Sequence, residues 1–129
     1  MTAIDIDKEF ATWLLEAKPR ILELSKSIGQ QAPPEAEQGR ESWLNELADR
    51  LSNNLQEVLE LNQIAETYWL NWCAKKSAEY EGAPKSRLDL VKNIDSTERR
   101  VYKYTEAMLK TIETRTSLTQ STLKFYRSV

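Results

Sequence analysis

Residues 81–86 read Glu-Gly-Ala-Pro-Lys-Ser, and this stretch decides how the chain folds. It contains one of only three glycines and one of four prolines in 129 residues. Both residue types are unfavourable inside a helix, and a long segment with helical spacing lies on each side of the stretch. Residues 81–86 therefore predict the turn of a long antiparallel helical hairpin.

The two arms of this hairpin are predicted helices over about 40–80 and about 87–127. Each arm carries apolar residues three and four positions apart, which places them on one helix face. At 1.5 Å per residue, each arm is roughly 60 Å long. The face of the first arm is formed by Leu44, Leu47, Ala48, Leu51, Leu55, Val58, Leu61, Ala65, Tyr68, Trp69 and Trp72. The face of the second arm is formed by Leu88, Val91, Ile94, Val101, Met108, Ile112, Leu123 and Tyr126.

A further helix is predicted before the hairpin, over about 5–28. Its apolar face consists of Phe10, Trp13, Leu14, Ala17, Ile21, Leu24 and Ile28. Pro19 interrupts the segment, but the apolar spacing continues in phase beyond it. We therefore expect either a kink or two helices nearly end to end. Residues 29–39, which hold Gly29, Pro33, Pro34 and Gly39, are the predicted linker to the hairpin.

These segments predict an all-α fold in a single domain over residues 1–129. A kinked N-terminal helix packs on a long antiparallel two-helix hairpin, giving a three-helix bundle of coiled-coil-like type. The composition agrees, since 40% of residues are hydrophobic, 29% are charged and Gly and Pro are scarce. The N-terminal helix is about half as long as the arms, so uncovered apolar surface predicts self-association as a dimer or larger oligomer.

The last arm ends in a segment crowded with hydroxyl side chains. These are Thr111, Thr114, Thr116, Ser117, Thr119, Ser121 and Thr122. Ser and Thr are indifferent helix formers. The segment either lines a close helix contact or polar interface, or frays.

Cysteine, charge and hydropathy limit the class of protein. Cys73 is the single cysteine, so an internal disulfide is excluded and a reducing, cytoplasmic setting is expected. The first seven residues lack the apolar core of a secretory signal, and no apolar run is long enough to cross a membrane. Residues 1–81 carry 8 Lys or Arg and 15 Asp or Glu, a net charge of −7, whereas residues 82–129 carry 10 and 5, a net charge of +5. The basic half either packs beside acidic helices of the same molecule or meets an anionic partner.

The sequence does not predict catalysis. It contains no histidine, which removes the commonest general base and metal ligand, and its glycines are too scattered for a phosphate-binding loop. The best acidic pairs, Glu57 with Glu60 and Asp95 with Glu98, are offset by about 14 residues in the hairpin, or roughly 20 Å. We therefore expect a protein that is not an enzyme, with no cofactor and no metal site.

One cluster of aromatic and basic residues near the turn is a candidate partner-binding site. It consists of Tyr68, Trp69 and Trp72 on the first arm and Arg99, Arg100, Lys103 and Tyr104 on the second. Trp, Tyr and Arg are enriched at interface hot spots, and aromatic and basic residues together also suit single-stranded nucleic acid. The same residues also suit an aromatic core layer with arginines stacked on its rim, and the residue types favour that interpretation.

Two stretches of the second arm, Lys85-Ser86-Arg87-Leu88-Asp89-Leu90-Val91 and Thr97-Glu98-Arg99-Arg100-Val101-Tyr102, together with the Ser/Thr-rich end, resemble small helical-hairpin proteins of phages and mobile elements. The resemblance covers about residues 45–127 and is one of pattern and length. It implies a non-enzymatic accessory protein that acts by protein–protein binding, such as a recombination accessory or an anti-defence inhibitor. The alternative is a nucleic-acid-binding accessory protein that uses the basic face of the helix over 87–127.

Overall fold

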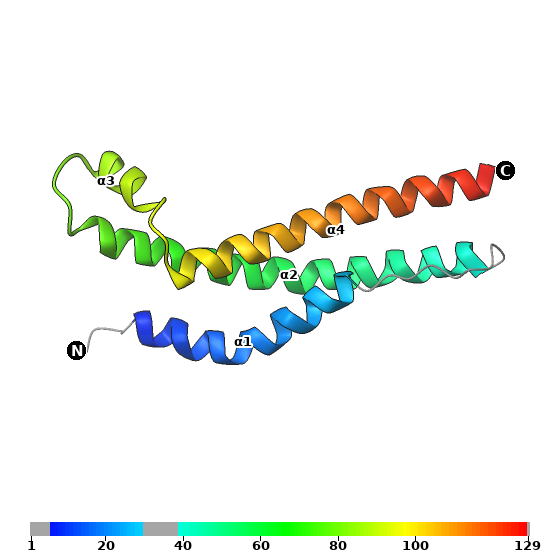
Figure 1. The fold of residues 1–129 in the computed structure, drawn as a ribbon, viewed down its shortest axis with the longest axis horizontal. Helices are drawn as coiled ribbons and strands as arrows, with labels where there is room; N and C mark the ends of the chain where they lie inside the picture. The colour runs from blue at the N-terminus through cyan, green and yellow to red at the C-terminus, as the bar shows by residue number, and fades with distance from the viewer. Residues whose placement is uncertain (1–5, 30–38, 129) are drawn as a thin grey trace.

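The computed structural model describes residues 6–29 and 39–128, and within them the chain forms four helices and no strand. These are α1 (Ile6–Gly29), α2 (Arg40–Ser77), α3 (Pro84–Val91) and α4 (Thr97–Ser128). Figure 1 shows α4 running back along α2, with α3 at the turn. The predicted all-α fold is confirmed. Most of the predicted linker, residues 30–38, and the predicted helix start at Asp5 lie outside the described residues.

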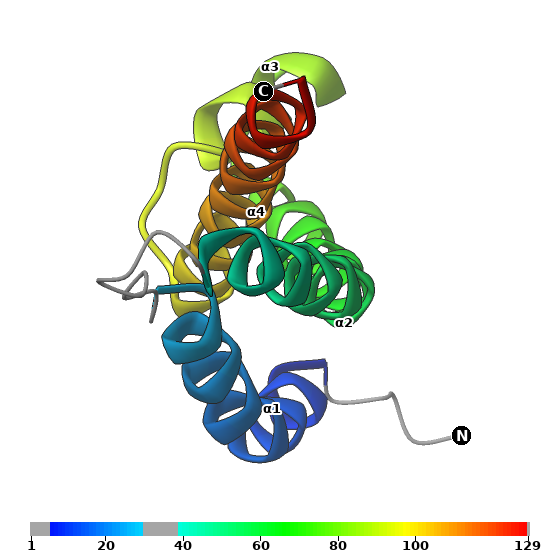
Figure 2. The same cartoon turned by 90° about the vertical axis from the view of Figure 1, so that its right-hand side faces the viewer.

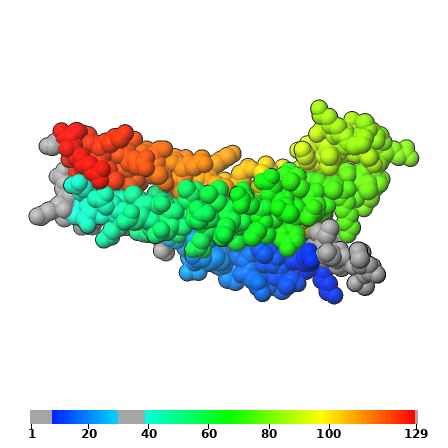
Figure 3. Space-filling model, turned by 180° about the vertical axis from the view of Figure 1, so that it is seen from behind, coloured from blue at the N-terminus to red at the C-terminus, as the bar shows by residue number. Residues whose placement is uncertain are grey.

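Helix α1 lies antiparallel to α2 and covers only the half of it that is nearer α3 (Figure 3). Phe10 packs edge-on against Tyr68, and Trp13 packs against it at a tilt, with ring centroids 5.4 and 5.5 Å away. Near the other end of α1, Asn54 donates a hydrogen bond to Ser27 over 2.9 Å. Figure 2 looks along the hairpin from the end opposite α3. The end of α4 and the start of α2 are nearest the viewer, and α1 lies below them.

Pro19 bends α1 without splitting it. The helix is continuous from Ile6 to Gly29 and changes direction near its middle (Figure 1). Pro19 has no N–H to donate to the carbonyl of Leu15, so the inner hydrogen-bond ladder loses one bond there. Of the two outcomes predicted for this position, the structure therefore has the kink.

The prediction of one helix over 87–127 is wrong in one respect. Residues 92–96 are not helical and separate α3 from α4. Ile94 donates its backbone N–H to the carbonyl of Val91 over 3.1 Å, which closes a turn after α3. Ser96 then caps α4, since its hydroxyl accepts the N–H of Arg99 over 3.1 Å. Asn93, Asp95 and Ser96 lie within four residues of one another. Their side chains favour a turn and a new helix start over continuation of α3.

The turn also lies slightly earlier than predicted. Helix α2 ends at Ser77 instead of near residue 80, and α3 begins at Pro84, so the turn consists of residues 78–83. Proline suits the first position of a helix, where its missing N–H has no partner to lose. Gly82 has a φ of +120°, which side chains other than glycine's rarely allow.

The core is formed in two parts. The larger lies where three helices meet and contains Ala17, Ile21, Leu24, Ile28, Leu47, Leu51, Val58, Met108 and Ile112. The smaller lies beneath α3 and contains Trp69, Cys73 and Val91, with Trp72, Leu88, Ile94 and Tyr102 packed around them. The predicted apolar faces thus supply both cores, but α1 reaches only part of the hairpin.

A buried polar pair lies between α2 and α4. Asn62 donates its amide to the hydroxyl of Thr105 over 3.0 Å, and both side chains are buried. Thr105 in turn donates to a carbonyl of its own helix, 3.0 Å away at Tyr102. The hydrogen bond of a polar pair inside an apolar interface forms in one register only. The pair therefore fixes the position of α4 along α2.

Asn62→Ala should lower the free energy of unfolding by about 1–3 kcal/mol, because it leaves buried polar groups without their donor. The double variant Asn62→Leu/Thr105→Val should recover most of that loss, since both polar partners are replaced by apolar groups of similar shape. Urea denaturation followed by circular dichroism measures both. A double variant less stable than Asn62→Ala would contradict the pair's role.

A charged contact fixes α1 on α2. The guanidinium of Arg20 donates to the carboxylate of Glu57, with 2.6 Å between Nε and Oε2, and also contacts Glu23 over 3.0 Å. The hydrogen bond from Arg20 lowers the pKa of the Glu57 carboxyl. A carboxyl whose pKa is lower in the folded state stabilises the fold above its unfolded pKa, about 4.3, and loses that contribution as the pH falls through the folded value.

Glu57→Gln should therefore lower the urea midpoint at pH 7, and the difference from the natural chain should shrink once the pH falls below about 4.3 and disappear below the lowered pKa of the folded state. The effect should be small, because both side chains are over 40% exposed. Glu60→Gln, an exposed change on the same helix, is the control and should give no such pH-dependent difference. Equal midpoints of Glu57→Gln and the natural chain at pH 7 would show that the contact adds nothing.

Candidate partner-binding groove

The structure does not bring the seven predicted site residues onto one face. Tyr68 and Tyr104 both contact α1: Tyr68 lies against Phe10 and Trp13, and the hydroxyl of Tyr104 is 2.8 Å from that of Ser25. These two residues hold the N-terminal helix in place.

Trp69 and Trp72 form the aromatic layer beneath α3. The ring of Trp69 stacks on Tyr102 with centroids 4.9 Å apart and planes at 12°, and it is only 9% exposed. Trp72 is half-buried in the same core. Burial also raises the pKa of Tyr102 to about 12, with Glu106 adding to the shift. Within this chain these rings are packing residues.

The three basic residues of the predicted site each have a local partner. Arg99 donates to the carbonyl of Lys92 over 3.1 Å, and Arg100 donates to Asp95 with 2.9 Å between Nε and Oδ1. The hydrogen bond from Arg100 lowers the pKa of the Asp95 carboxyl. Lys103 lies 3.6 Å from Glu106. Arg99 and Arg100 therefore stabilise the non-helical segment between α3 and α4.

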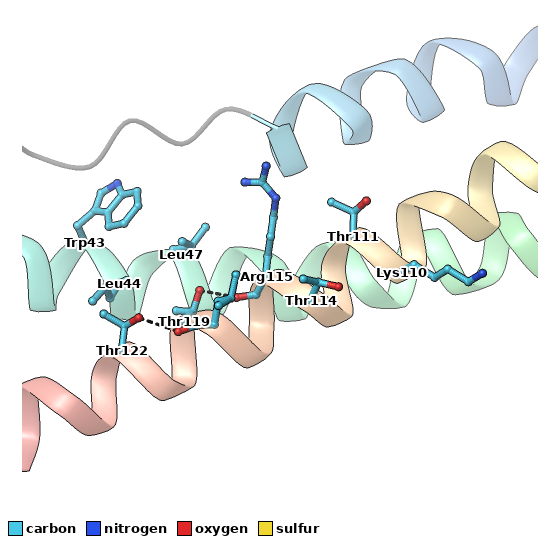
Figure 4. Close-up of a pocket in the computed structure, with 10 residues that line it drawn as sticks. Trp43, Leu44, Leu47, Lys110, Thr111, Thr114, Arg115, Thr119 and Thr122 are labelled. Atoms are coloured by element: carbon cyan, nitrogen blue, oxygen red, sulfur yellow. Dashed lines mark hydrogen bonds between the residues drawn. The ribbon is translucent and has the colours of Figure 1, made fainter.

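A different feature stands out at the far end of the hairpin, where α1 has ended. Between α2 and α4 lies an open groove of about 550 Å³. It is lined by Trp43, Leu44 and Leu47 of α2 and by Lys110, Thr111, Thr114, Arg115, Leu118, Thr119 and Thr122 of α4. Figure 4 shows Trp43 and Arg115 pointing to the side of the hairpin on which α1 ends.

The groove continues the surface of α2 and α4 on which α1 lies, which we call the seat of α1. A hollow at the end of α1 is bordered by Ile28 and Gly29 on one side and by Met108 and Thr111 on the other. Thr111 also lines the groove, which then runs on along α4. Leu118 lies seven residues after Thr111 and is 63% exposed, so the face that α1 covers earlier on α4 is uncovered here.

Three threonine hydroxyls of the groove wall are already hydrogen-bonded within α4. Thr111, Thr119 and Thr122 donate their hydroxyls to carbonyls four residues earlier, over 3.0, 2.7 and 2.8 Å. Their hydrogen-bonding capacity is thereby used within α4. The Ser/Thr-rich segment is helical to Ser128, against the alternative that it frays, and a polar interface on it stays a prediction.

A second apolar hollow lies on the outer side of α1 around the bend. Leu14, Leu15 and Leu22 line it with Lys18, and Leu15 is 79% exposed. Apolar surface of this kind is what the predicted self-association would use, and that association stays a prediction.

Within residues 6–29 and 39–128, no group of three or more His, Cys, Asp or Glu side chains is placed to hold a metal. Two of the acids considered from the sequence, Glu57 and Asp95, are bound by Arg20 and Arg100. None of the described helices combines the length and the apolarity that crossing a membrane takes.

Comparison with known proteins gives no relative: no protein-family model matches the chain, and neither curated proteins nor solved structures give a significant match. The features of the groove must therefore carry the functional argument.

Of the two cores, the one beneath α3 has buried hydrogen-bond donors without acceptors. Trp69 Nε1 and Arg87 Nε are buried with no acceptor among the described residues. Each such donor costs about 1–3 kcal/mol. Cys73 is fully buried in this core, and burial raises the pKa of its thiol. We expect α3 to open more readily than the three-helix part.

Cys73 should react with a disulfide reagent far more slowly in the native chain than in denaturant, through opening of α3. Val91→Ala, which removes two methyl groups packed on this core, should speed the native reaction about tenfold. Ile112→Ala is the control: it weakens the larger core and should change the rate less. Equal acceleration by both variants would show that Cys73 is exposed only by global unfolding.

Proposed function

We propose that this chain is a non-enzymatic helical accessory protein that acts by binding another protein in the groove between α2 and α4. One observation carries the proposal: α1 fills the third position of the bundle along only half of the hairpin, and the apolar groove continues where it ends. Exposed apolar side chains that line a groove are common at sites of protein–protein contact.

The residues in and beside the groove support a protein partner. Trp43 packs half-buried against the larger core, and tryptophan is enriched among the hot-spot residues of interfaces. Leu118 and, seven residues later, Phe125 are 63% and 65% exposed. Aromatic and aliphatic groups aligned along one helix face suit the apolar side of a partner.

The nucleic-acid alternative has less support. Arg99, Arg100 and Lys103 are engaged with Lys92, Asp95 and Glu106, and those contacts would compete with phosphate contacts. Single-stranded nucleic acid also needs exposed rings on which bases stack, whereas Trp69 is buried. A cytoplasmic setting and a link to phages or mobile elements remain part of the proposal, and the neighbouring genes would test that link.

A photo-reactive amino acid at position 118 should cross-link one defined protein in cells, and the same residue at Gln120, an exposed position outside the groove, should not. With that partner purified, Leu118→Arg should weaken binding at least thirtyfold, as expected for a hot-spot side chain. Gln120→Arg is the matched control and should leave binding unchanged. Cross-linking from both positions alike, or full binding by Leu118→Arg, would refute the proposed function.

A further inference from the structure

Helix α3 packs on one other helix only. Its backbone has close neighbours in α2 and in no other described helix, and Val91 is its one fully buried side chain. Leu88 is half-buried beside it, whereas Leu90 is 60% exposed. Figure 1 shows α3 at the end of the hairpin with a loop on either side. The larger core of the described residues includes none from α3, so the other three helices pack together without it.

Two hydrogen-bond donors are left unpaired while α3 covers its core. Trp69 Nε1 on α2 and Arg87 Nε on α3 are buried, with no acceptor among residues 6–29 and 39–128. Opening of α3 would bring both donors to water, which offsets part of the cost of exposing apolar side chains. Trp69 stays on the hairpin when α3 leaves, so its N–H becomes a free donor on the uncovered surface.

The turn before α3 is the place where opening is biased without a change in the core. Gly82 has a φ of +120°, and nothing lies within 4 Å of the position that a Cβ would take. A side chain at this residue therefore strains the backbone of the closed turn without a clash. Release of α3 lets the turn relax and removes that strain. Gly29 also has nothing within 4 Å of a Cβ and has no such φ, so it supplies a matched control.

We propose that α3 is a lid over a second binding surface at this end of the hairpin. The lid swings away as one body on residues 78–83 and 92–96, while α1, α2 and α4 stay packed. The surface that it uncovers consists of the stacked rings of Trp69 and Tyr102, with Trp72 beside them. The ligand is a flat apolar group with one hydrogen-bond acceptor, because the rings offer apolar faces and Trp69 Nε1 is a donor without an acceptor among the described residues.

The lid makes the affinity for the ligand depend on how often α3 is open. Closed α3 and the ligand compete for the same rings, so only the open fraction of the chain binds. While that fraction is small, a change in the opening equilibrium changes the apparent Kd by the same factor. The groove lies at the other end of the hairpin, so this inference does not rest on the proposed function.

Hydrogen exchange followed by NMR tests the lid in the full chain. The indole N–H of Trp69 and the backbone N–H of Lys92, which closes the last turn of α3, should exchange through one opening. Gly82→Ala should accelerate both at least fivefold by straining the closed turn, and Gly29→Ala should change neither. Ile112→Val, which weakens the larger core, should also change neither. Equal acceleration by Ile112→Val and Gly82→Ala would show that both groups are exposed by global unfolding alone, against the lid.

The dye anilinonaphthalene sulfonate tests the binding surface, since it joins flat apolar rings to sulfonate acceptors. Its fluorescence titration with the full chain should give a Kd that Gly82→Ala lowers by the same factor by which it accelerates exchange. Gly29→Ala and Leu118→Arg, the latter in the groove, should leave this Kd unchanged. In NMR spectra the dye should shift the indole N–H resonance of Trp69 and leave that of Trp43 in place. Circular dichroism confirms that each variant folds.

Three further results would overturn the proposal. An unchanged Kd in Gly82→Ala despite faster exchange would show that α3 opens without controlling a binding surface. A dye-induced shift confined to Trp43 would place the dye in the groove. An internal water bound to Trp69 Nε1 in a crystal structure would supply the acceptor and remove the reason for a ligand that carries one.

Discussion

The structure depends on a mismatch in helix length. Helix α1 has 24 residues, whereas α2 has 38 and α4 has 32. A third helix lets α2 and α4 bury side chains on two sides, and the larger core lies mostly where all three are present. Beyond α1, two helices cannot enclose wide apolar faces by themselves. The groove is therefore a direct consequence of where α1 ends.

The position of α1 is fixed by contacts that cannot be shifted together. Arg20 with Glu57, Ser27 with Asn54 and Tyr104 with Ser25 are specific polar pairs on two different walls. Sliding α1 along the seat to cover the groove would separate all three pairs and remove Phe10 and Trp13 from Tyr68. Polar pairs of this kind contribute register more than stability. They fix the point along α2 and α4 at which α1 ends.

Apolar spacing in the sequence predicts the helices and their buried faces well, because periodic burial is a local signal. Leu51 and Val58, both on the predicted face, are fully buried. The break at residues 92–96 is missed because Val91, Ile94 and Val101 keep helical spacing across it, while the stronger cap at Ser96 decides the outcome. Two contacts lie near the break: Arg100 pairs with Asp95, and Trp69 stacks on Tyr102.

The candidate site was harder to predict from sequence, for a physical reason. A large ring with a polar edge suits a buried layer as well as an interface, so residue type alone cannot separate Trp69, which is covered, from Trp43, which is partly open. What separates them is whether another element lies over the residue. Trp69 is covered by α3 and by Tyr102 of α4, whereas α1 ends before it reaches Trp43. The Ser/Thr-rich end of α4 did carry a signal, since Leu118 and Phe125 recur seven residues apart within it. Both side chains are exposed, and two apolar residues seven positions apart on one helix face have the spacing that contact with another helix uses.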